Sequence, residues 1–170
     1  MKRFAEIPSP LGPILVTSEE AVLTRLYLKY DRVPTGDGWT EDASAFRELA
    51  AQLDGYWTGG RTTFDVPIRA EGTVFQKRVW AALSEIPYGT TVSYGELATA
   101  IGKPRAVRAV GRANAWNPIS IIVPCHRVIG RDGSLTGYGG GIDNKRRLLE
   151  LEGIHFVPAT EAEGAPFVSP

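Results

Sequence analysis

The stretch from Asn117 to Val128 constrains the fold of this chain more than any other. Its residues 119–123 are apolar except for Ser120, and Pro124 ends the run. A short apolar run bounded by prolines predicts a buried strand or extended segment, because the residue before a proline is restricted to extended backbone. The residues after Pro124 are therefore expected where a buried element emerges on a stiff backbone.

Cys125, the single cysteine of the chain, follows this run together with His126 and Arg127. A lone cysteine is often a buried core residue. Here a histidine and an arginine stand directly beside it, and both can favour the reactive thiolate. We therefore interpret Cys125 as a nucleophile. Adjacent side chains of an extended segment point to opposite faces, so we expect His126 to act on the sulfur through a bridging water.

Composition limits the class of protein. At 170 residues the chain is long enough for one or two small domains. Its single cysteine excludes an internal disulfide framework and suits a reducing compartment. The amino terminus has no apolar stretch long enough for a signal or a membrane span. We expect a cytoplasmic protein with no membrane partner.

The charges are unevenly distributed, although their sum is zero. Residues 1–71 have a net charge of −3, residues 72–150 of +6, and the residues from 151 onward of −3. Residues 101–131 hold six basic residues and no acidic one. A basic stripe confined to one segment indicates a phosphate-bearing partner. The alternative, a solvated helix face, usually mixes both signs.

Residues 1–71 show no chemical signal and predict a supporting α/β domain. Alternating polarity and turn residues over 4–28 predict a meander of short strands. The Gly-, Pro- and Asp-rich residues 31–40 predict a loop, and the apolar periodicity of 43–57 predicts a helix. Residues 64–68 are expected to close the small sheet.

The next segment predicts three helices. Thr73 is expected to cap a helix that runs to Leu83, with its apolar face formed by residues 74, 75, 79, 80 and 83. Ser93 and Glu96 form a capping box that begins a helix over 94–101. Gly102 ends that helix, and a second one is expected over 104–114, with proline in its first turn. Two short helices joined by a glycine-containing turn predict a helix-turn-helix.

The second of these two helices carries Arg105, Arg108 and Arg112, whose spacing places them on one face. Small residues stand beside them, at Ala106, Ala109 and Gly111. Arginines among small residues suit contact with the DNA backbone and insertion into the duplex better than the reading of base edges. An alanine-rich packing helix with solvated arginines is the alternative.

The segment after the cysteine predicts a hairpin, a loop and a helix. Residues 128–130 and 135 flank a glycine-containing turn at 131–134. The glycine-rich loop 136–141 holds Tyr138, a plausible wall for a flat ligand. A helix is expected over 143–152, and residues 157–170 predict a flexible tail.

Five segments resemble, in order, the motifs of the O6-alkylguanine-DNA alkyltransferases of the bacterial type: Val92–Gly95, Arg105–Gly111, Pro124–Val128, Thr136–Tyr138 and Leu151–Gly153. The resemblance is strong over residues 73–154 and covers the first seventy residues only in outline. It implies an α+β protein, with a ribonuclease-H-like α/β domain (1–71) followed by a mostly helical domain (72–156) that holds the helix-turn-helix and the active-site cysteine. Some relatives bind zinc in the first domain through Cys and His side chains. In this sequence no cysteine or histidine precedes Cys125, so that kind of site cannot form. We predict no metal and no cofactor.

The resemblance implies a DNA repair enzyme, a methylated-DNA–[protein]-cysteine S-methyltransferase. Its substrate would be double-stranded DNA with O6-alkylguanine, and O4-alkylthymine is a further candidate. The damaged nucleotide would be flipped out of the duplex, and the alkyl group would move to Cys125. A thioether has no easy route back, so each molecule would act once. We expect a monomer in solution, and the sequence leaves cooperative binding to DNA open.

Residue roles follow from the same resemblance. Glu152 would hold His126, and Asn117 would brace the active-site loop through backbone hydrogen bonds. Tyr94 would donate to guanine N3 and also contact DNA, and Arg108 would fill the vacated stack. The substrate pocket would be formed by Pro124, Val128, Tyr138, Gly139 and Lys145, with the carbonyls of residues 125 and 128 accepting from the guanine amine. Relatives often carry serine at position 139, and the glycine here offers its backbone N–H instead.

Two other classes of function remain in view. A non-catalytic damage sensor of similar fold would lack the cysteine, so Cys125 disfavours it. A cysteine hydrolase without a DNA partner is disfavoured by the adjacent order of Cys125 and His126 and by the arginines of the second helix.

Overall fold

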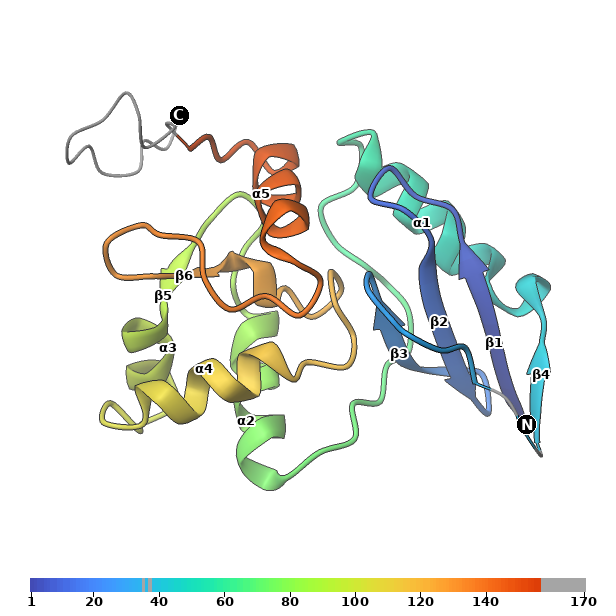
Figure 1. Ribbon diagram of the computed structural model, residues 1–170, viewed down its shortest axis with the longest axis horizontal. Coiled ribbons are helices and arrows are strands. Elements are labelled where there is room, and N and C mark those ends of the chain that lie inside the picture. Colours follow the sequence, from blue (N-terminus) through green and yellow to red (C-terminus); the bar gives the residue numbers. More distant parts are fainter. Residues whose placement is uncertain (35, 37, 157–170) are drawn as a thin grey trace.

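The computed structural model describes residues 1–34, 36 and 38–156, which form a sheet followed by a helical region (Figure 1). The sheet contains β1 (Lys2–Ile7), β2 (Ile14–Glu19), β3 (Val22–Tyr27) and β4 (Trp39–Glu41) in the order β3-β2-β1-β4. Strands β1 to β3 form the predicted antiparallel meander, and β4 pairs with β1 in parallel. The predicted tail, residues 157–170, lies outside the described residues.

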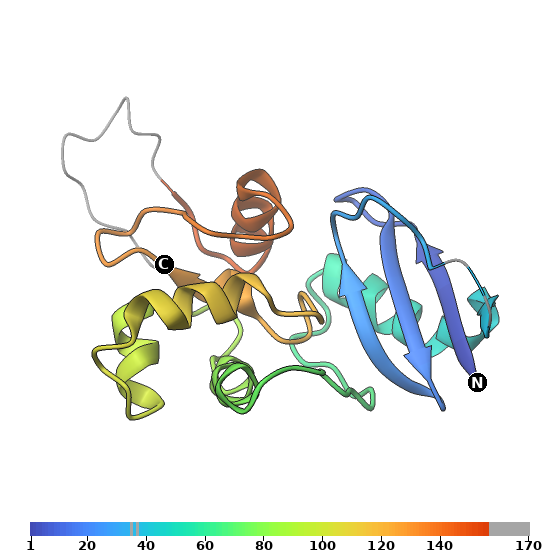
Figure 2. The ribbon, with the colours of Figure 1, turned by 60° about the horizontal axis from the view of Figure 1, so that its bottom comes forward.

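The helix predicted over 43–57 is a 3-10 turn, η1 (Ala43–Phe46), continued by α1 (Arg47–Trp57). Helix α1 crosses one face of the sheet (Figure 2) and buries Leu49, Leu53 and Tyr56. These residues belong to a core cluster that continues into the helical region. A domain boundary between residues 71 and 72 stays a prediction.

Residues 64–68 do not form the expected strand. Only Ile68 makes an isolated bridge, with Leu23, and the other edge of the sheet is taken by β4. Pro67 explains why the pairing stays short, because a proline lacks the N–H that a ladder requires. Its carbonyl still accepts from the Leu23 N–H at 2.9 Å.

The outer edge of β3, which bridges Ile68 at Leu23, also binds the active-site loop directly. The Leu26 N–H donates to the Pro118 carbonyl at 2.9 Å, and the Ser120 N–H donates to the Leu26 carbonyl at 3.0 Å. Leu26 and Ile119 form a parallel bridge. The sheet therefore holds the segment that leads to Cys125.

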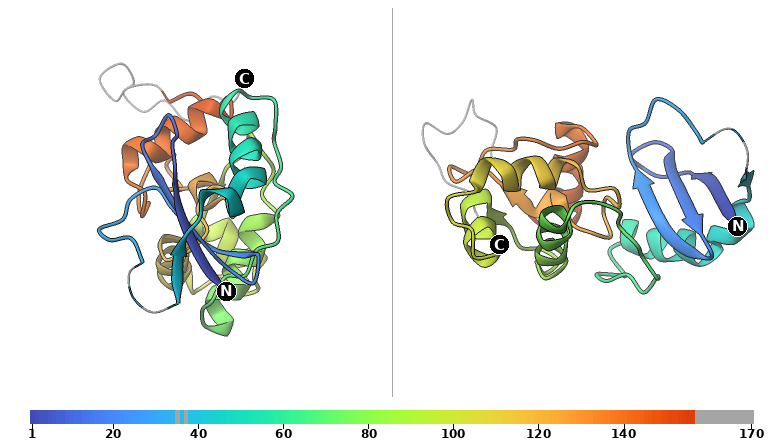
Figure 3. Two further views of the ribbon diagram at one scale, coloured as in Figure 1. Left: turned by 90° about the vertical axis from the view of Figure 1, so that its right-hand side faces the viewer. Right: turned by 90° about the horizontal axis from the view of Figure 1, so that it is seen from below.

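The helical region contains α2 (Val74–Ser84), α3 (Tyr94–Ala100), α4 (Val107–Ala115) and α5 (Ile142–Leu151). Capping boxes at Thr73 and Ser93 begin α2 and α3, as predicted. Val74, assigned to the apolar face of α2, is instead 88% exposed. Helix α3 and the start of α4 lie at the end of the molecule remote from the sheet (Figure 3). No helix in the described residues is long and apolar enough to cross a membrane.

The second helix of the predicted helix-turn-helix begins later than expected. Residues 104–106 form a turn closed by a hydrogen bond from the Ala106 N–H to the Lys103 carbonyl at 2.8 Å, and Ala106 is the N-cap of α4. Arg105 therefore precedes the helix and does not share the helix face of Arg108 and Arg112.

Within the apolar run 119–123, Ile119 makes the bridge to Leu26, and the residues that follow form turns and a bend rather than an extended segment. Asn117 causes this, because its side chain accepts from the Ile119 N–H at 3.0 Å and donates to the Val123 carbonyl at 2.7 Å. Ile121 is forced to a φ of +71°, a left-handed conformation that is strained for a β-branched residue. Cys125–Arg127 is a 3-10 helix, η2.

The hairpin expected over 128–135 has the predicted turn but not the predicted strand pairing. The Gly130 N–H donates to the Ser134 carbonyl at 2.8 Å, which closes the turn. Strand β6 (Val128–Ile129) then pairs in parallel with β5 (Val92–Ser93) rather than with residue 135.

Candidate active site

Cys125 is the first residue of η2 and is only 3% exposed. Its Sγ accepts a hydrogen bond from Nδ2 of Asn117 at 3.1 Å, the same side chain that closes the preceding loop. Asn117 is itself buried. The sulfur is thus held by the residue that shapes its loop.

The thiol is protonated in the resting protein. Burial raises the pKa of Cys125, and the hydrogen bond from Asn117 and the positive charge of Lys145 offset this increase only in part. Lys145 is buried on α5 and donates to the carbonyls of Val128 and Thr136. Its burial lowers the pKa of Lys145 to about 8, while Cys125 acts in the opposite direction. A base is therefore needed to form the thiolate.

His126 is completely buried, and its Nε2 lies 2.8 Å from Oε1 of Glu152. Burial lowers the pKa of the His126 imidazole, so the ring is neutral at neutral pH. With Nε2 donating to the carboxylate, Nδ1 is the acceptor nitrogen. Nδ1 is buried and has no hydrogen-bond partner among the described residues.

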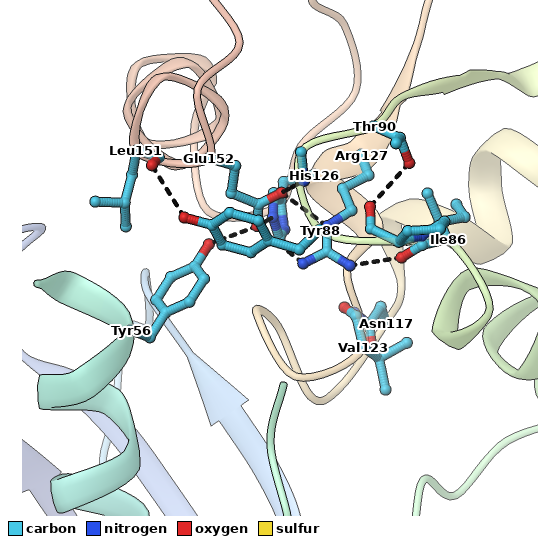
Figure 4. A network of polar contacts seen from close by, with 12 residues as sticks. Tyr56, Ile86, Tyr88, Thr90, Asn117, Val123, His126, Arg127, Leu151 and Glu152 are labelled. Atoms are coloured by element: carbon cyan, nitrogen blue, oxygen red, sulfur yellow. Dashed lines mark hydrogen bonds and ion pairs between the residues drawn. The ribbon is translucent and has the colours of Figure 1, made fainter. Parts of the chain in front are cut away.

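Glu152 follows α5 and binds five donors (Figure 4). Oε1 accepts from the Tyr56 hydroxyl at 2.7 Å, from Nε2 of His126 at 2.8 Å and from Nη2 of Arg127 at 3.0 Å. Oε2 accepts from Nε of Arg127 at 2.8 Å and from the Gly89 N–H at 3.2 Å. Burial alone would raise the pKa of Glu152, but the hydrogen bonds and charges of His126 and Arg127 lower it to about 2. The carboxylate is therefore ionised at neutral pH.

Arg127 does not act on the sulfur as the sequence suggested. Its guanidinium is bound by Glu152 and by the Ile86 carbonyl, at 2.6 Å from Nη1. It is 7% exposed, so its charge is not part of a basic surface either. Lys145, not Arg127, is the cation that favours the thiolate of Cys125.

Of the residues assigned to the substrate pocket, Pro124 directly precedes Cys125, and Lys145 and Tyr138 lie near enough to interact electrostatically with its thiol. Pro124, Val128 and Tyr138 are buried, and the exposed Gly139 lies so close to α4 that an added Cβ would stand 3.2 Å from the Ala115 carbonyl. The Tyr94 hydroxyl donates to the Thr136 carbonyl at 2.8 Å. The two carbonyls assigned to the guanine amine already have donors, Lys145 for residue 128 and Asn114 for residue 125.

The residues assigned to DNA contact lie on or just before α4, except for Tyr94, which is the first residue of α3. Arg105, Arg108, Ala109 and Arg112 are exposed, and Ala106 is half-buried. Gly111 packs beside Tyr94, but an added Cβ would stand 3.7 Å from the ring, an ordinary contact distance that does not by itself require glycine.

Tyr56 and Gly89 were missed by sequence reasoning. Tyr56 was identified only as a member of an apolar helical stripe. The one available signal is chemical, since a buried tyrosine needs a partner for its hydroxyl. Nothing in the sequence identified Glu152 as that partner.

Both halves of the chain match models of one protein family. Residues 2–70 match 6-O-methylguanine DNA methyltransferase, ribonuclease-like domain, and residues 74–154 match 6-O-methylguanine DNA methyltransferase, DNA binding domain. The ribonuclease-like match agrees with the fold expected for the first seventy residues.

Individual relatives agree with these matches. A methylated-DNA–protein-cysteine methyltransferase of Mycobacterium tuberculosis is 54% identical over 153 residues, which cover 89% of this chain and 93% of the relative. That of Methanosarcina acetivorans is 51% identical over 154 residues, covering 88% and 97%.

Solved structures agree as well. The crystal structure of the M. tuberculosis O6-methylguanine methyltransferase superposes with a TM-score of 0.83 at 54% identity, covering 89% of this chain and 93% of that one. M. tuberculosis OGT in complex with DNA superposes with a TM-score of 0.82 at 53% identity, covering 88% and 92%. With matches over both of its halves, this chain belongs to the 6-O-methylguanine DNA methyltransferase family.

Proposed function

We propose that this protein repairs O6-alkylguanine in duplex DNA by moving the alkyl group to Cys125. As a member of its family the chain is a methylated-DNA–protein-cysteine methyltransferase, and DNA is its partner. The observation that carries the residue assignment is the arrangement around one sulfur. Asn117 binds Sγ at 3.1 Å, and the adjacent His126 is neutral and anchored on Glu152 at 2.8 Å.

His126 is the base in this proposal. The thiol proton of Cys125 passes, through a bridging water, to Nδ1 of His126, and the Glu152 carboxylate stabilises the resulting imidazolium. Nδ1 is buried and has no hydrogen-bond partner within residues 1–34, 36 and 38–156, which supports this role. Lys145 adds a positive charge that favours the thiolate.

The thiolate then attacks the alkyl carbon on O6. The sulfur–carbon bond forms as the carbon–oxygen bond breaks, and the electron pair of that bond goes to guanine. Tyr94 gives its hydroxyl proton to N3 of the leaving base and is reprotonated at the expense of the His126 imidazolium, so the net reaction moves the thiol proton to guanine. The carbonyls of Cys125 and Val128 exchange their present donors for the guanine amine.

DNA binding and base flipping are assigned to α4. The exposed Arg105 and Arg112 neutralise phosphates, and the small residues Ala106, Ala109 and Gly111 let the backbone approach the groove. Arg108 fills the stack that the flipped nucleotide leaves, offsetting a cost of a few kcal/mol. The same pocket would admit O4-alkylthymine.

Three further expectations stay predictions. A free catalytic thiol functions in a reducing compartment, which suits the cytoplasm. The protein is expected to be a monomer in solution, and cooperative binding on DNA remains to be measured.

The decisive experiment combines a duplex that carries one O6-methylguanine with intact-protein mass spectrometry. A mass gain of one methyl group, mapped to Cys125 and absent from Cys125→Ser, is the expected result. DNA binding by an unmodified wild-type protein would instead indicate a damage sensor. Absence of both binding and modification would favour a hydrolase.

A further inference from the structure

Tyr56 connects the sheet region to the carboxylate of the active site. It lies on α1, is 0% exposed, and donates its hydroxyl to Oε1 of Glu152, 96 residues further along the chain, at 2.7 Å. Figure 4 shows the tyrosine extending from α1 into the polar network around Glu152, His126 and Arg127. A region without any chemical signal in its sequence thus supplies a donor to this network.

Aromatic side chains fix the Tyr56 ring from three sides. The ring centroids of Trp57, Phe64 and Tyr88 lie 5.2, 5.4 and 6.1 Å away, and Tyr88 meets the ring at 90°. Burial, reinforced by the neighbouring Glu152, raises the pKa of Tyr56 far above its ordinary value. The hydroxyl is therefore protonated, and able to donate, at neutral and acid pH.

The oxygen that Tyr56 binds is the oxygen that binds His126. Oε1 of Glu152 is shared by the tyrosine hydroxyl, the imidazole and one nitrogen of Arg127. Each donor draws negative charge from the carboxylate, so each weakens its attraction for a proton on the imidazole. Removing the hydroxyl would strengthen that attraction while leaving the other two donors in place.

The other charges that face His126 act in known directions. Glu152 raises the pKa of the imidazole, whereas burial, Arg127 on the same 3-10 helix and Lys145 on α5 lower it. The Cys125 thiol is neutral at rest and Tyr88 is a neutral phenol, so neither opposes these groups. Glu152 is therefore the one anion among these groups that raises the pKa of His126, and the hydrogen bond from Tyr56 moderates its charge.

We propose that Tyr56 is a positioning residue for the alkyl transfer, which holds Oε1 of Glu152 and moderates its charge so that His126 keeps a free Nδ1. The role of the Tyr56–Glu152 hydrogen bond in alkyl transfer rests on the proposed function. Its effect on the pKa of His126 does not. The N-terminal region is then a contributor to the reaction and not only a support.

The test is an NMR titration of the histidines in Tyr56→Phe. The chain has only two histidines, and the second, His155, is exposed and serves as an internal reference. The titration midpoint of His126 should rise by roughly half a pKa unit to one unit. Tyr88→Phe is the matched control, because its hydroxyl binds the Leu151 carbonyl at 3.1 Å and not the carboxylate. His126 should titrate there as in the unsubstituted protein.

A second substitution predicts the opposite sign. 3-Fluorotyrosine at position 56 has a more acidic phenol and donates more strongly, so it should lower the His126 midpoint. The proposal is overturned if the His126 midpoint in Tyr56→Phe is not above that of the unsubstituted protein. It is also overturned if His126 fails to titrate before acid unfolding in both proteins.

Rate measurements separate this proposal from the proposed function. In Tyr56→Phe the acid limb of the methyl-transfer rate should move to higher pH together with the His126 midpoint. An unsubstituted protein that accepts no methyl group would refute the proposed function alone. The His126 titration would still test the effect of the hydrogen bond from Tyr56 to Glu152. A moved midpoint with an unmoved acid limb would overturn the positioning role.

Discussion

Nδ2 of Asn117 donates to Sγ of Cys125 at 3.1 Å, and Oδ1 of the same side chain accepts from the Ile119 N–H at 3.0 Å. One amide therefore closes a loop and holds the nucleophile at its end. The loop contains Ile121 at a φ of +71°, which costs about 1–3 kcal/mol and persists only where surrounding contacts enforce it. Asn117 supplies those contacts.

Asn117→Ala should destabilise the protein by about 2–3 kcal/mol, because buried backbone groups of residues 119 and 123 lose their partner. Urea unfolding followed by tryptophan fluorescence measures this loss. Asn144→Ala is the control, since it removes one hydrogen bond to the Gly140 carbonyl and should cost about 1 kcal/mol. A loss for Asn117→Ala no larger than that of the control would show that the loop does not depend on the amide.

Glu152 predicts an acid-labile component of stability. Its pKa in the folded protein is about 2, below the ordinary value of 4.5. A depressed folded pKa stabilises the protein above the unfolded pKa, and this stability is lost as the pH falls from 4.5 toward 2. The loss amounts to about 3 kcal/mol.

The comparison of Glu152→Gln with the unsubstituted protein isolates this component. Between pH 5 and pH 2.5 the unfolding free energy should fall less steeply with decreasing pH in Glu152→Gln than in the unsubstituted protein. At neutral pH Glu152→Gln should be less stable by about 3–5 kcal/mol, because the buried Arg127 loses its partner. Glu150→Gln, at an exposed position nearby, should follow the unsubstituted protein. Parallel pH curves for all three proteins would contradict the assignment.

Local signals in the sequence predicted the parts of this fold that local interactions decide. The capping boxes at Thr73 and Ser93 join residues three positions apart, and both helices begin where those residues predicted. The meander of β1 to β3 follows from alternating polarity in the same way. The family motifs then allowed Glu152 to be assigned to His126, and these two side chains are in contact.

Tertiary contacts decided what the sequence could not predict. The apolar run 119–123 forms turns because a side chain outside it, Asn117, ties its ends together. Arg127 binds Glu152 instead of acting on the sulfur, since a buried guanidinium requires a carboxylate. Tyr56 joins the same carboxylate over a separation of 96 residues, a pairing that no local pattern encodes.

Arg108→Ala should slow methyl transfer from duplex DNA about tenfold more than transfer from free O6-benzylguanine, because a free base is never flipped. Single-turnover rates with both substrates measure this difference. Arg25→Ala removes the same charge from the exposed side of β3 and should leave both rates unchanged. Equal losses on the two substrates would remove the proposed role of Arg108 in flipping.

The stoichiometry of the reaction tests the central claim most directly. The chain has one cysteine, so no second thiol can attack the product, and His126 and Glu152 can form a thiolate but cannot remove a carbon from sulfur. With a large excess of O6-methylguanine DNA, repaired guanine should rise to one equivalent per protein and stop, with the methyl group on Cys125. Guanine formation that continues past one equivalent, or a methyl group on any other residue, would contradict the account.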